Sequence, residues 1–490
     1  MFTKNSKKIV LAIFLIAILI RLVGITMPIL EGSATRQTQT AMISRNFFND
    51  GFDILYPRVD SAGTDKGYHL LEFPIVTALA ALIYGLLGGA HAWVGRLISI
   101  VFFAGAFLFL YDLTRRLFSE RTAIWAVIVF SISPLSIIFS RTFMPDFAML
   151  FFCIGSIYFM YLYSSAGSRS GFWLSCAFSA VALLAKPQSF YIVVPLIYLL
   201  WQKEKVRFFL SPRNWIYLII ALLPAILWYT HAGSVMRQLS AGEAYNFEFL
   251  HWFQPRLFLQ KELYIDLLNI YSGIFLTPVG FALFIGALFL KTAKEKALIW
   301  AWFAGVILFM AVFNSHIDLE YYNLIMLPVA SIFIARMIEF LATLDWRQKT
   351  FLKNRVAQVI LCIILLAPIL RYALYAYIVP RGYRYLPVAG ERIQELSSKE
   401  DLIIASSAGG PQGLYFCDRK GWSFLLPVSD GKEAEEAIEE LKAMRRQGAR
   451  FFVATVMADL NASPAFKRYM FKNYRLIEDE PGEYIIFSLR

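Results

Sequence analysis

The sequence predicts a polytopic α-helical membrane protein with a small α/β domain at its C-terminal end. Of its 490 residues, 58% are hydrophobic and 17% are charged, whereas soluble domains carry about 25% charged residues. Apolar runs approaching or reaching the 17–25 residues that cross a bilayer recur along the first 380 positions. Beyond them, polar boundaries separate short strand-like segments. We therefore expect a transmembrane domain over 1–380 and a domain outside the membrane over 381–490.

Twelve apolar runs are candidates for membrane spans, and two of them are short. Cytoplasmic loops hold an excess of Lys and Arg. If the run 73–90 does not cross, the inner loops carry 18 basic residues in 51 positions and the outer loops carry 9 in 119. If this run did cross, every later loop would change sides and the basic loops would face outward. We therefore expect eleven spans, within a range of 11–13. The candidates are 9–27, 73–90, 94–113, 122–140, 146–164, 171–185, 189–201, 214–231, 268–290, 297–313, 323–341 and 356–379.

The first outer loop is about 65 residues long, more than a connection needs. Its segment "EGSATRQTQTAMISRNFF" predicts a helix with Ser33 or Thr35 as its N-terminal cap. The segment "EFPIVTALAALIYGLLGG" follows, and we expect it to lie against the membrane surface as a second juxtamembrane helix. Trp93 suits an interfacial position.

The C-terminal segment alternates strand-like and helix-like patterns. "DLIIASS", "GARFFVATV" and "EYIIFSLR" are rich in β-branched and aromatic residues and predict strands. "DGKEAEEAIEELKAMRRQ", between the first and the second of these segments, predicts an amphipathic helix. This order predicts a small α/β domain.

The net charge of +12 is concentrated in the predicted inner loops, which argues against a nucleic-acid partner. Cys153, Cys176 and Cys362 fall in apolar runs and Cys417 stands alone in the polar tail. Their spacing indicates neither a disulfide framework nor a metal site. The basic N-terminal end and its apolar run resemble a signal peptide, but Arg21 interrupts the run, so we expect an uncleaved first span.

A carboxylate in "FSRTFMPDFAMLFF" stands between two apolar runs. A charge near hydrocarbon costs several kcal/mol unless it is hydrated or paired. Pro145 disfavours helix at the residue before it, so we expect a new helix to begin at Asp146, on the outer side and with Arg141 as a cationic neighbour. The same membrane level carries further polar residues of both signs, which suggests a site: Glu31, Arg36, Arg45, Arg141, Lys186 and the cluster "HIDLEYY" at 316–322.

Several of these residues have a plain structural alternative. Lys186 in "ALLAKPQSF" and Arg141 are either snorkelling side chains at span ends or cations for a phosphate. His316 with Asp318 and Glu320 forms a weak zinc pattern. We therefore expect no cofactor and no metal, with a divalent metal as the alternative.

Several motifs are familiar in their order: "EFP" before a juxtamembrane helix, "GRLISIVFFAGAFLFLYDLTRRLF", "SPLSIIFSRTFMPD", "LLAKPQSF" and "HIDLEYYNLIMLP". Over about residues 9–340 the chain resembles membrane glycosyltransferases of the GT-C fold, in particular bacterial relatives of protein O-mannosyltransferases and lipid A aminoarabinose transferases. The segment "GLYFCDRKGWSF" resembles the outward-facing domain of some bacterial members.

The resemblance implies a glycosyltransferase of the inner (cytoplasmic) membrane, a hexosyl- or pentosyltransferase that uses a polyprenyl-phosphate sugar. The acceptor would be a lipid, glycan or protein outside the membrane, and a single displacement would invert the anomeric centre. Asp146 matches the second acidic position of the family. Glu31 is the nearest match for the first, a few residues early, and Glu72 stands where a lysine is often found. The expected roles are catalytic for Glu31 and Asp146, donor phosphate binding for Lys186, Arg141 and Arg36, and substrate binding for His316, Glu320, Tyr321 and Tyr322.

Two other functions remain open. A transporter or flippase of lipid-linked glycans would also need a charged cavity, but such proteins often show symmetric broken helices, and no second half resembles the first. A membrane scaffold with an outer binding domain would keep its function when Asp146 or Lys186 is neutralised.

Overall fold

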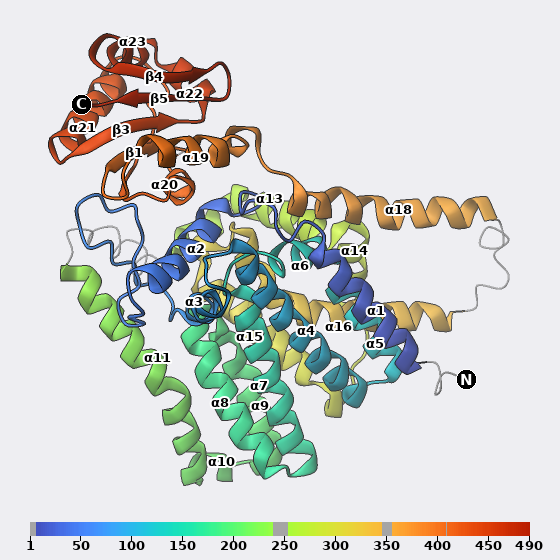
Figure 1. Ribbon diagram of the computed structural model, residues 1–490. Helices are drawn as coiled ribbons and strands as arrows, with labels where there is room; N and C mark the ends of the chain where they lie inside the picture. The colour runs from blue at the N-terminus through green and yellow to red at the C-terminus, as the bar shows by residue number, and fades with distance from the viewer. Residues whose placement is uncertain (1–5, 239–252, 345–354, 408) are drawn as a thin grey trace. The chain divides into compact units, whose positions relative to one another are not determined.

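The computed structural model describes residues 6–238, 253–344, 355–407 and 409–490, and helices dominate it (Figure 1). Internal contacts divide the chain into two compact units. The first contains residues 1–25, 71–76 and 96–376, and the second contains residues 26–70, 77–95 and 377–490. The second unit thus includes the predicted first outer loop as well as the C-terminal segment.

Each predicted apolar run of the first unit coincides with a helix or with two helices separated by a short break. Two of the breaks lie next to prolines, Pro134 and Pro278, because proline removes a backbone donor and clashes with the preceding turn. Pro224 and Pro368, in contrast, lie inside continuous helices. The helices are α1 (Ser6–Leu22), α4 (Ala92–Leu117), α5 (Glu120–Ile132), α6 (Pro134–Phe139), α7 (Asp146–Ala166), α8 (Arg169–Ala185), η1 (Pro187–Ile192), α9 (Val193–Glu204), α10 (Arg207–Leu210), α11 (Pro212–Gln238), α13 (Lys261–Ile270), α14 (Thr277–Leu288), α15 (Leu298–Val312), η6 (Glu320–Met326), α16 (Leu327–Thr343) and α18 (Arg355–Ala373).

Within the described residues, four helical segments are long and apolar enough to cross a membrane: α4, α7, α11 and the continuous segment Glu320–Thr343. A fifth is added if Lys261–Phe275 and Thr277–Leu288, which meet at 109°, form one broken span. Helices such as α8 and α15 are apolar but have 17 and 15 residues, about 22–26 Å at 1.5 Å per residue. The count of eleven spans therefore stays a prediction.

The predicted orientation has a direct test. We expect a reporter fused after Arg355 to be cytoplasmic and one fused near Gly390 to be external. The basic loop 345–355 on which this rests lies largely outside the described residues. Both reporters on the same side would contradict the eleven-span arrangement.

The C-terminal part of the second unit forms a five-stranded mixed sheet (Figure 1). Its strand order is β2-β1-β3-β5-β4, with β1 parallel to β2 and β3, and β5 antiparallel to β3 and β4. The three predicted strands are confirmed as β1, β3 and β5, while β2 and β4 were not predicted. The strands are β1 (Leu402–Ser406), β2 (Gly421–Ser423), β3 (Ala449–Ala454), β4 (Arg475–Glu480) and β5 (Tyr484–Ser488).

Helices cover both faces of this sheet, because alternate residues along each strand point to opposite sides. Ile404, Phe452 and Phe487 pack with α21 (Lys432–Arg446), α22 (Met457–Ala462) and α23 (Pro464–Asn473). The predicted amphipathic helix is thus confirmed as α21. The other face packs with α19 (Leu386–Leu396), α20 (Gln412–Cys417) and Met42 of α2 (Ala34–Asn49).

The predicted juxtamembrane helix of the first outer loop is α3 (Ile75–Leu87), with 13 residues. Ala78 and Ala81 pack against Ile43 and Phe47 of α2. Leu79, Leu82 and Leu86 of α3 are exposed. A short helix with one face packed on α2 and an exposed apolar face agrees with the prediction that this run lies against the membrane surface.

Candidate active site

Asp146 begins helix α7 directly after Pro145, as the sequence predicted. The loop between α6 and α7 is held by Ser99 of α4, whose hydroxyl donates hydrogen bonds to the carbonyls of Thr142 at 2.6 Å and Met144 at 3.3 Å. Asp146 is 1% exposed. The carboxylate is therefore buried. The loop that positions it is held in place by hydrogen bonds from α4.

Lys186 is the partner of this carboxylate. Helix α8 ends at Ala185, Lys186 is extended, and Pro187 starts η1. The Lys186 ammonium donates a hydrogen bond to Asp146 Oδ1 at 2.8 Å, and Lys186 is 4% exposed. The sequence expected Arg141 as the cationic neighbour of Asp146, whereas the cation that pairs with it is Lys186. Of the two alternatives for Lys186, burial argues against a snorkelling side chain, and its role in phosphate binding stays a prediction.

The cluster at 316–322 contributes two aromatic rings to this pair. The Lys186 ammonium lies 4.8 Å from the ring centre of Tyr321 and 5.9 Å from that of Tyr322, within range for cation–π attraction. His316 stacks on Tyr322, with ring centres 5.4 Å apart. Glu320 is exposed at the start of η6. The structure therefore brings together Asp146, Lys186, His316, Tyr321 and Tyr322, which the sequence proposed from three separate regions.

The buried pair retains unused hydrogen-bonding capacity. Among the described residues, Asp146 Oδ2 has no hydrogen-bond partner. An ammonium carries three donors, and within the same residues Lys186 uses one of them, on Asp146 Oδ1. A buried ion pair with unsatisfied atoms is poorly stabilised by itself. Within the described residues, a donor of Lys186 and an acceptor of Asp146 are thus left unused at one point.

Arg141 has a structural task. Its guanidinium donates hydrogen bonds to the carbonyls of Val23 at 2.9 Å and Gly24 at 3.1 Å, just beyond the end of α1, and to the carbonyl of Ala376. The side chain is fully buried. Its role in phosphate binding stays a prediction from the sequence.

An apolar groove of about 580 Å³ adjoins the residue after Lys186. It lies between the end of α8, η1 and α11, and Arg237 is among the residues that line it. Its volume falls within the range of about 300–1,000 Å³ that is common for small-molecule sites. The lining residues are Leu183, Pro187, Phe190, Leu222, Ala225, Ile226, Tyr229, Thr230, Arg237 and Phe313.

The other two predicted residues belong to the second unit. Glu31 is 1% exposed, and its carbonyl accepts a hydrogen bond of 2.8 Å from the Gln37 side chain. Arg36 is half-buried and donates to Gln39 Oε1 at 3.3 Å. Ser33 stands at the N-cap position of α2 with a φ of 54°, but its side chain makes no capping hydrogen bond. The roles of Glu31 and Arg36 stay predictions.

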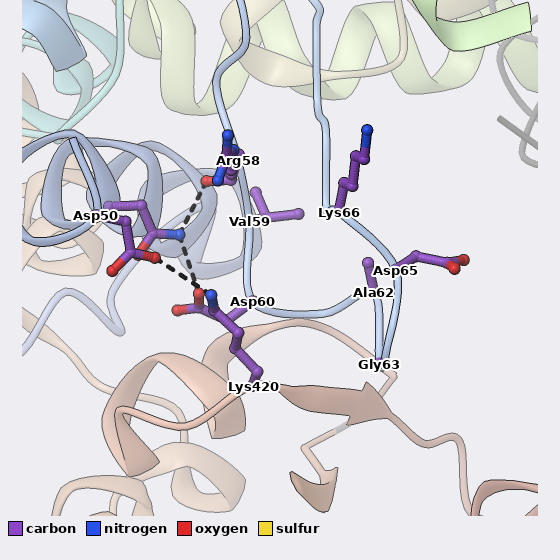
Figure 2. A pocket seen from close by; sticks show the side chains of 10 residues that line it. Asp50, Arg58, Val59, Asp60, Ala62, Gly63, Asp65, Lys66 and Lys420 are labelled. Atoms are coloured by element: carbon purple, nitrogen blue, oxygen red, sulfur yellow. Dashed lines mark hydrogen bonds and ion pairs between the residues drawn. The ribbon is translucent and has the colours of Figure 1, made fainter. Parts of the chain in front are cut away.

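Figure 2 shows a small polar pocket in the second unit, lined by Asp50, Asp60, Lys66 and Lys420 among others. Its volume of about 20 Å³ accommodates a water molecule but no sugar ring. Within the described residues no group of three His, Cys, Asp or Glu side chains is placed to hold a metal ion. The expectation that the protein needs no cofactor stays a prediction.

Comparison with known proteins places this geometry in context. Residues 72–229 match the family described as dolichyl-phosphate-mannose-protein mannosyltransferase, and this region contains both Asp146 and Lys186. ArnT from Cupriavidus metallidurans, bound to undecaprenyl phosphate, matches with a TM-score of 0.63 at 14% identity over 98% of both chains. The chain has the GT-C fold. The resemblance predicted from the sequence is confirmed at this level.

A second GT-C structure matches over a similar extent. The oligosaccharyltransferase from Archaeoglobus fulgidus, tethered to an acceptor peptide with the NVT sequon, has a TM-score of 0.59 at 12% identity. The match covers 100% of this chain and 74% of that one. No curated protein matches the sequence. These matches show the GT-C fold, and the residues of the site carry the functional argument.

Proposed function

We propose that this GT-C protein is a membrane glycosyltransferase that moves a sugar from a polyprenyl-phosphate donor to an acceptor outside the cytoplasmic membrane. The observation that carries the proposal is the buried Asp146–Lys186 pair, which has a free carboxylate oxygen and spare ammonium donors within the part of the chain that the structure describes. An apolar groove is lined by Pro187, the residue after Lys186. Support also comes from the fold shared with ArnT, solved with undecaprenyl phosphate.

The donor fits this arrangement at both of its ends. Its prenyl tail would occupy the apolar groove, which removes apolar surface from water. Its phosphate would accept hydrogen bonds from the unused Lys186 donors, which are charge-assisted and therefore strong. When the sugar–phosphate bond breaks, the negative charge on the leaving polyprenyl phosphate increases. Lys186 would offset that charge at the place where it develops.

The two carboxylates, Asp146 and Glu31, would have different roles in the reaction. Asp146 fixes the position of Lys186 through Oδ1, and its Oδ2 would accept a hydrogen bond from a hydroxyl of the donor or the acceptor. A general base on the other face of the sugar would take the proton of the acceptor hydroxyl, worth about 10²–10⁴-fold in rate. We propose Glu31 for this task on the basis of the family resemblance. One such displacement inverts the anomeric centre.

The proposal is tested in proteoliposomes with a panel of undecaprenyl-phosphate-linked hexoses and pentoses. A transferase releases undecaprenyl phosphate in step with sugar transfer to a glycan, lipid or peptide acceptor. Movement of an intact donor between leaflets, without cleavage of the sugar–phosphate bond, would instead identify a transporter. Full turnover after neutralising both Asp146 and Lys186 would show that this pair is not the site of the reaction.

Filling the groove gives a prediction of its own. Ala225 of α11 lines the groove, so Ala225→Trp is expected to raise the KM for a long-chain donor at least about tenfold, because it removes the space for the prenyl tail. Leu223→Trp is the matched control, since Leu223 is on the same helix, is 47% exposed and lies outside the groove. Equal KM values for the two variants would exclude the groove as the tail site.

A further inference from the structure

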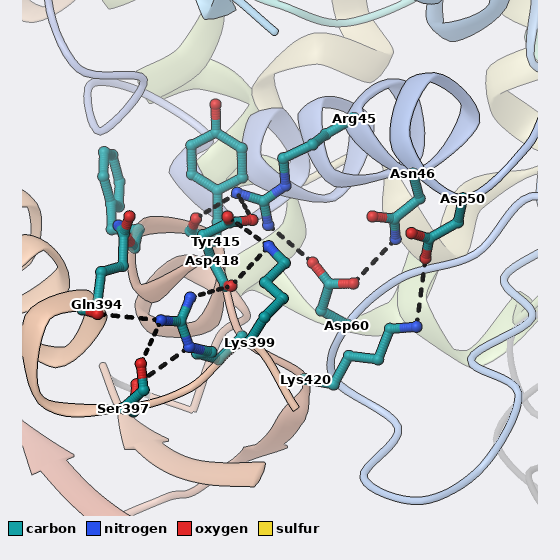
Figure 3. Close-up of polar contacts among 12 residues, drawn as sticks. Arg45, Asn46, Asp50, Asp60, Gln394, Ser397, Lys399, Tyr415, Asp418 and Lys420 are labelled. Carbon is teal, nitrogen blue, oxygen red and sulfur yellow. Dashed lines mark hydrogen bonds and ion pairs between the residues drawn. The ribbon is translucent and has the colours of Figure 1, made fainter. Parts of the chain in front are cut away.

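Arg45 of α2 lies between two carboxylates that are far apart in the sequence (Figure 3). Its guanidinium contacts Asp60 at 2.8 Å and Asp418 at 3.0 Å. It also donates to the carbonyl of Tyr415 at 2.8 Å, and it lies 4.9 Å from the centre of the Tyr415 ring. The side chain is 11% exposed. One largely buried cation thus joins α2, the predicted first outer loop and the turn between α20 and β2.

Neighbouring groups complete this network. The Asn46 amide, one residue after Arg45, donates to Asp60 Oδ1 at 2.9 Å and to the carbonyl of Arg58 at 3.1 Å. Lys420 pairs with Asp50 at 3.2 Å. Burial acts to lower the pKa of Arg45, but Asp60 and Asp418 outweigh it and the pKa is raised. The guanidinium is therefore stabilised in its charged form by this surrounding.

The backbone adds a second connection between the same segments. Gly63 N–H donates to the carbonyl of Gly421 at 2.7 Å, and Gly421 N–H donates to the carbonyl of Asp60 at 3.0 Å. The outer loop therefore extends the edge of the sheet beside β2, as in β-strand addition. A side chain at Gly63 would meet the indole of Trp422 at 2.2 Å. Only glycine permits this close approach.

The opposite end of α2 is also held by the C-terminal part of the chain. The Gln412 amide donates to the Thr35 hydroxyl at 2.8 Å. Leu30 and Ala34 pack with Leu386 of α19. Both ends of α2 are thus attached to elements beyond residue 380, and Glu31 lies three residues before Ala34, the first residue of the helix.

We propose that Arg45 is a positioning residue, which clamps α2 to the C-terminal domain and thereby fixes the segment Glu31–Arg36 for sugar transfer. The inference rests on the proposed function. Helix α2 has 16 residues and is about 24 Å long. A rigid helix of this length transmits a small tilt at Arg45 to a displacement at its other end, and misplacement by about 1 Å costs a reaction about a hundredfold. The C-terminal domain is then a required part of the enzyme rather than a separate binding module.

The test uses the full-length protein in lipid nanodiscs and two independent measurements. Amide hydrogen exchange over residues 34–49 reports whether Arg45 holds α2, without any substrate. Turnover of an undecaprenyl-phosphate-linked sugar reports the consequence. The variants are Arg45→Met, Arg45→Lys and the control Arg392→Met, which removes a more exposed ion-paired arginine of α19 in the same domain.

We expect Arg45→Met to speed exchange in α2 at least about tenfold and to lower kcat by a similar factor. Binding of undecaprenyl phosphate, a probe for the Asp146–Lys186 site, is expected to stay within about twofold of wild type. Arg45→Lys should recover part of kcat, because a cation returns without the forked geometry of arginine. Arg392→Met should behave as wild type in both measurements.

Two results would overturn the inference. One is wild-type exchange in Arg45→Met, which would show that Arg45 does not hold α2. The other is faster exchange with full turnover, which would show that the position of α2 does not matter to the reaction. A wild-type protein that turns over none of the donors would instead contradict the proposed function, while the exchange data would still decide whether Arg45 clamps α2.

Discussion

Asp146→Asn is expected to lower turnover at least about a hundredfold, the loss that follows removal of an acid–base or charge-orienting group. The amide keeps the shape of the side chain and an oxygen that accepts from Lys186, but it removes the negative charge. The measurement is single-turnover release of undecaprenyl phosphate at saturating donor. A carboxylate that only starts helix α7 would contribute about 0.3–1 kcal/mol of stability and nothing to the rate.

The control for this variant is Asp112→Asn. Asp112 of α4 also forms ion pairs with arginines, Arg115 and Arg116, but it is 22% exposed. Its amide variant should keep wild-type turnover. A folded Asp146→Asn protein with the same turnover as Asp112→Asn would remove Asp146 from the reaction.

Lys186→Met is expected to lower the free energy of unfolding by about 3–5 kcal/mol, because it leaves the Asp146 carboxylate buried without its cation. A snorkelling lysine at a span end, one of the two alternatives from the sequence, would add little to stability. Lys186 is instead 4% exposed. The measurement is denaturant unfolding in detergent micelles, with Lys442→Met, at a surface ion pair, expected to cost less than about 1 kcal/mol.

Stability and activity separate in the double variant. Asp146→Asn with Lys186→Met removes both charges, so most of the lost stability should return while turnover stays at or below the level of Asp146→Asn. Additive losses of stability would show that the two side chains do not interact. Recovery of both stability and turnover would show that the pair is structural.

Local signals were sufficient to predict the apolar helices, α21 and the start of α7 at Asp146, but not α19, α20, α22 and α23. Pro145 stops one helix and leaves Asp146 in the first turn of the next, because a proline disfavours helix at the residue before it. The strands β1, β3 and β5 are buried and rich in β-branched or aromatic residues, so the sequence predicts them. β2 has three residues, and β4 reads "RLIEDE" at the sheet edge, where charged side chains protect an exposed strand and hide its pattern.

Partners distant in the sequence were not predicted. Lys186 is 40 residues from Asp146. The sequence around Lys186 suits a snorkelling lysine as well as a buried one. Arg45 was noted only as one of several outer polar residues, because its carboxylate Asp418 lies more than 350 positions later. No periodic pattern in the sequence indicates the Lys186–Asp146 pair or the Arg45–Asp418 pair. Both depend on how the helices and the sheet pack, which no local pattern encodes.

The most direct measurement is the binding of undecaprenyl phosphate to the purified protein in nanodiscs. The comparison is between wild type and the double variant Asp146→Asn with Lys186→Met, which is expected to fold. If the buried pair is the donor phosphate site, wild type binds saturably and the double variant binds at least about tenfold more weakly, because a charge-assisted contact is lost. Equal affinity of the two proteins would contradict the assignment of this pair to the donor.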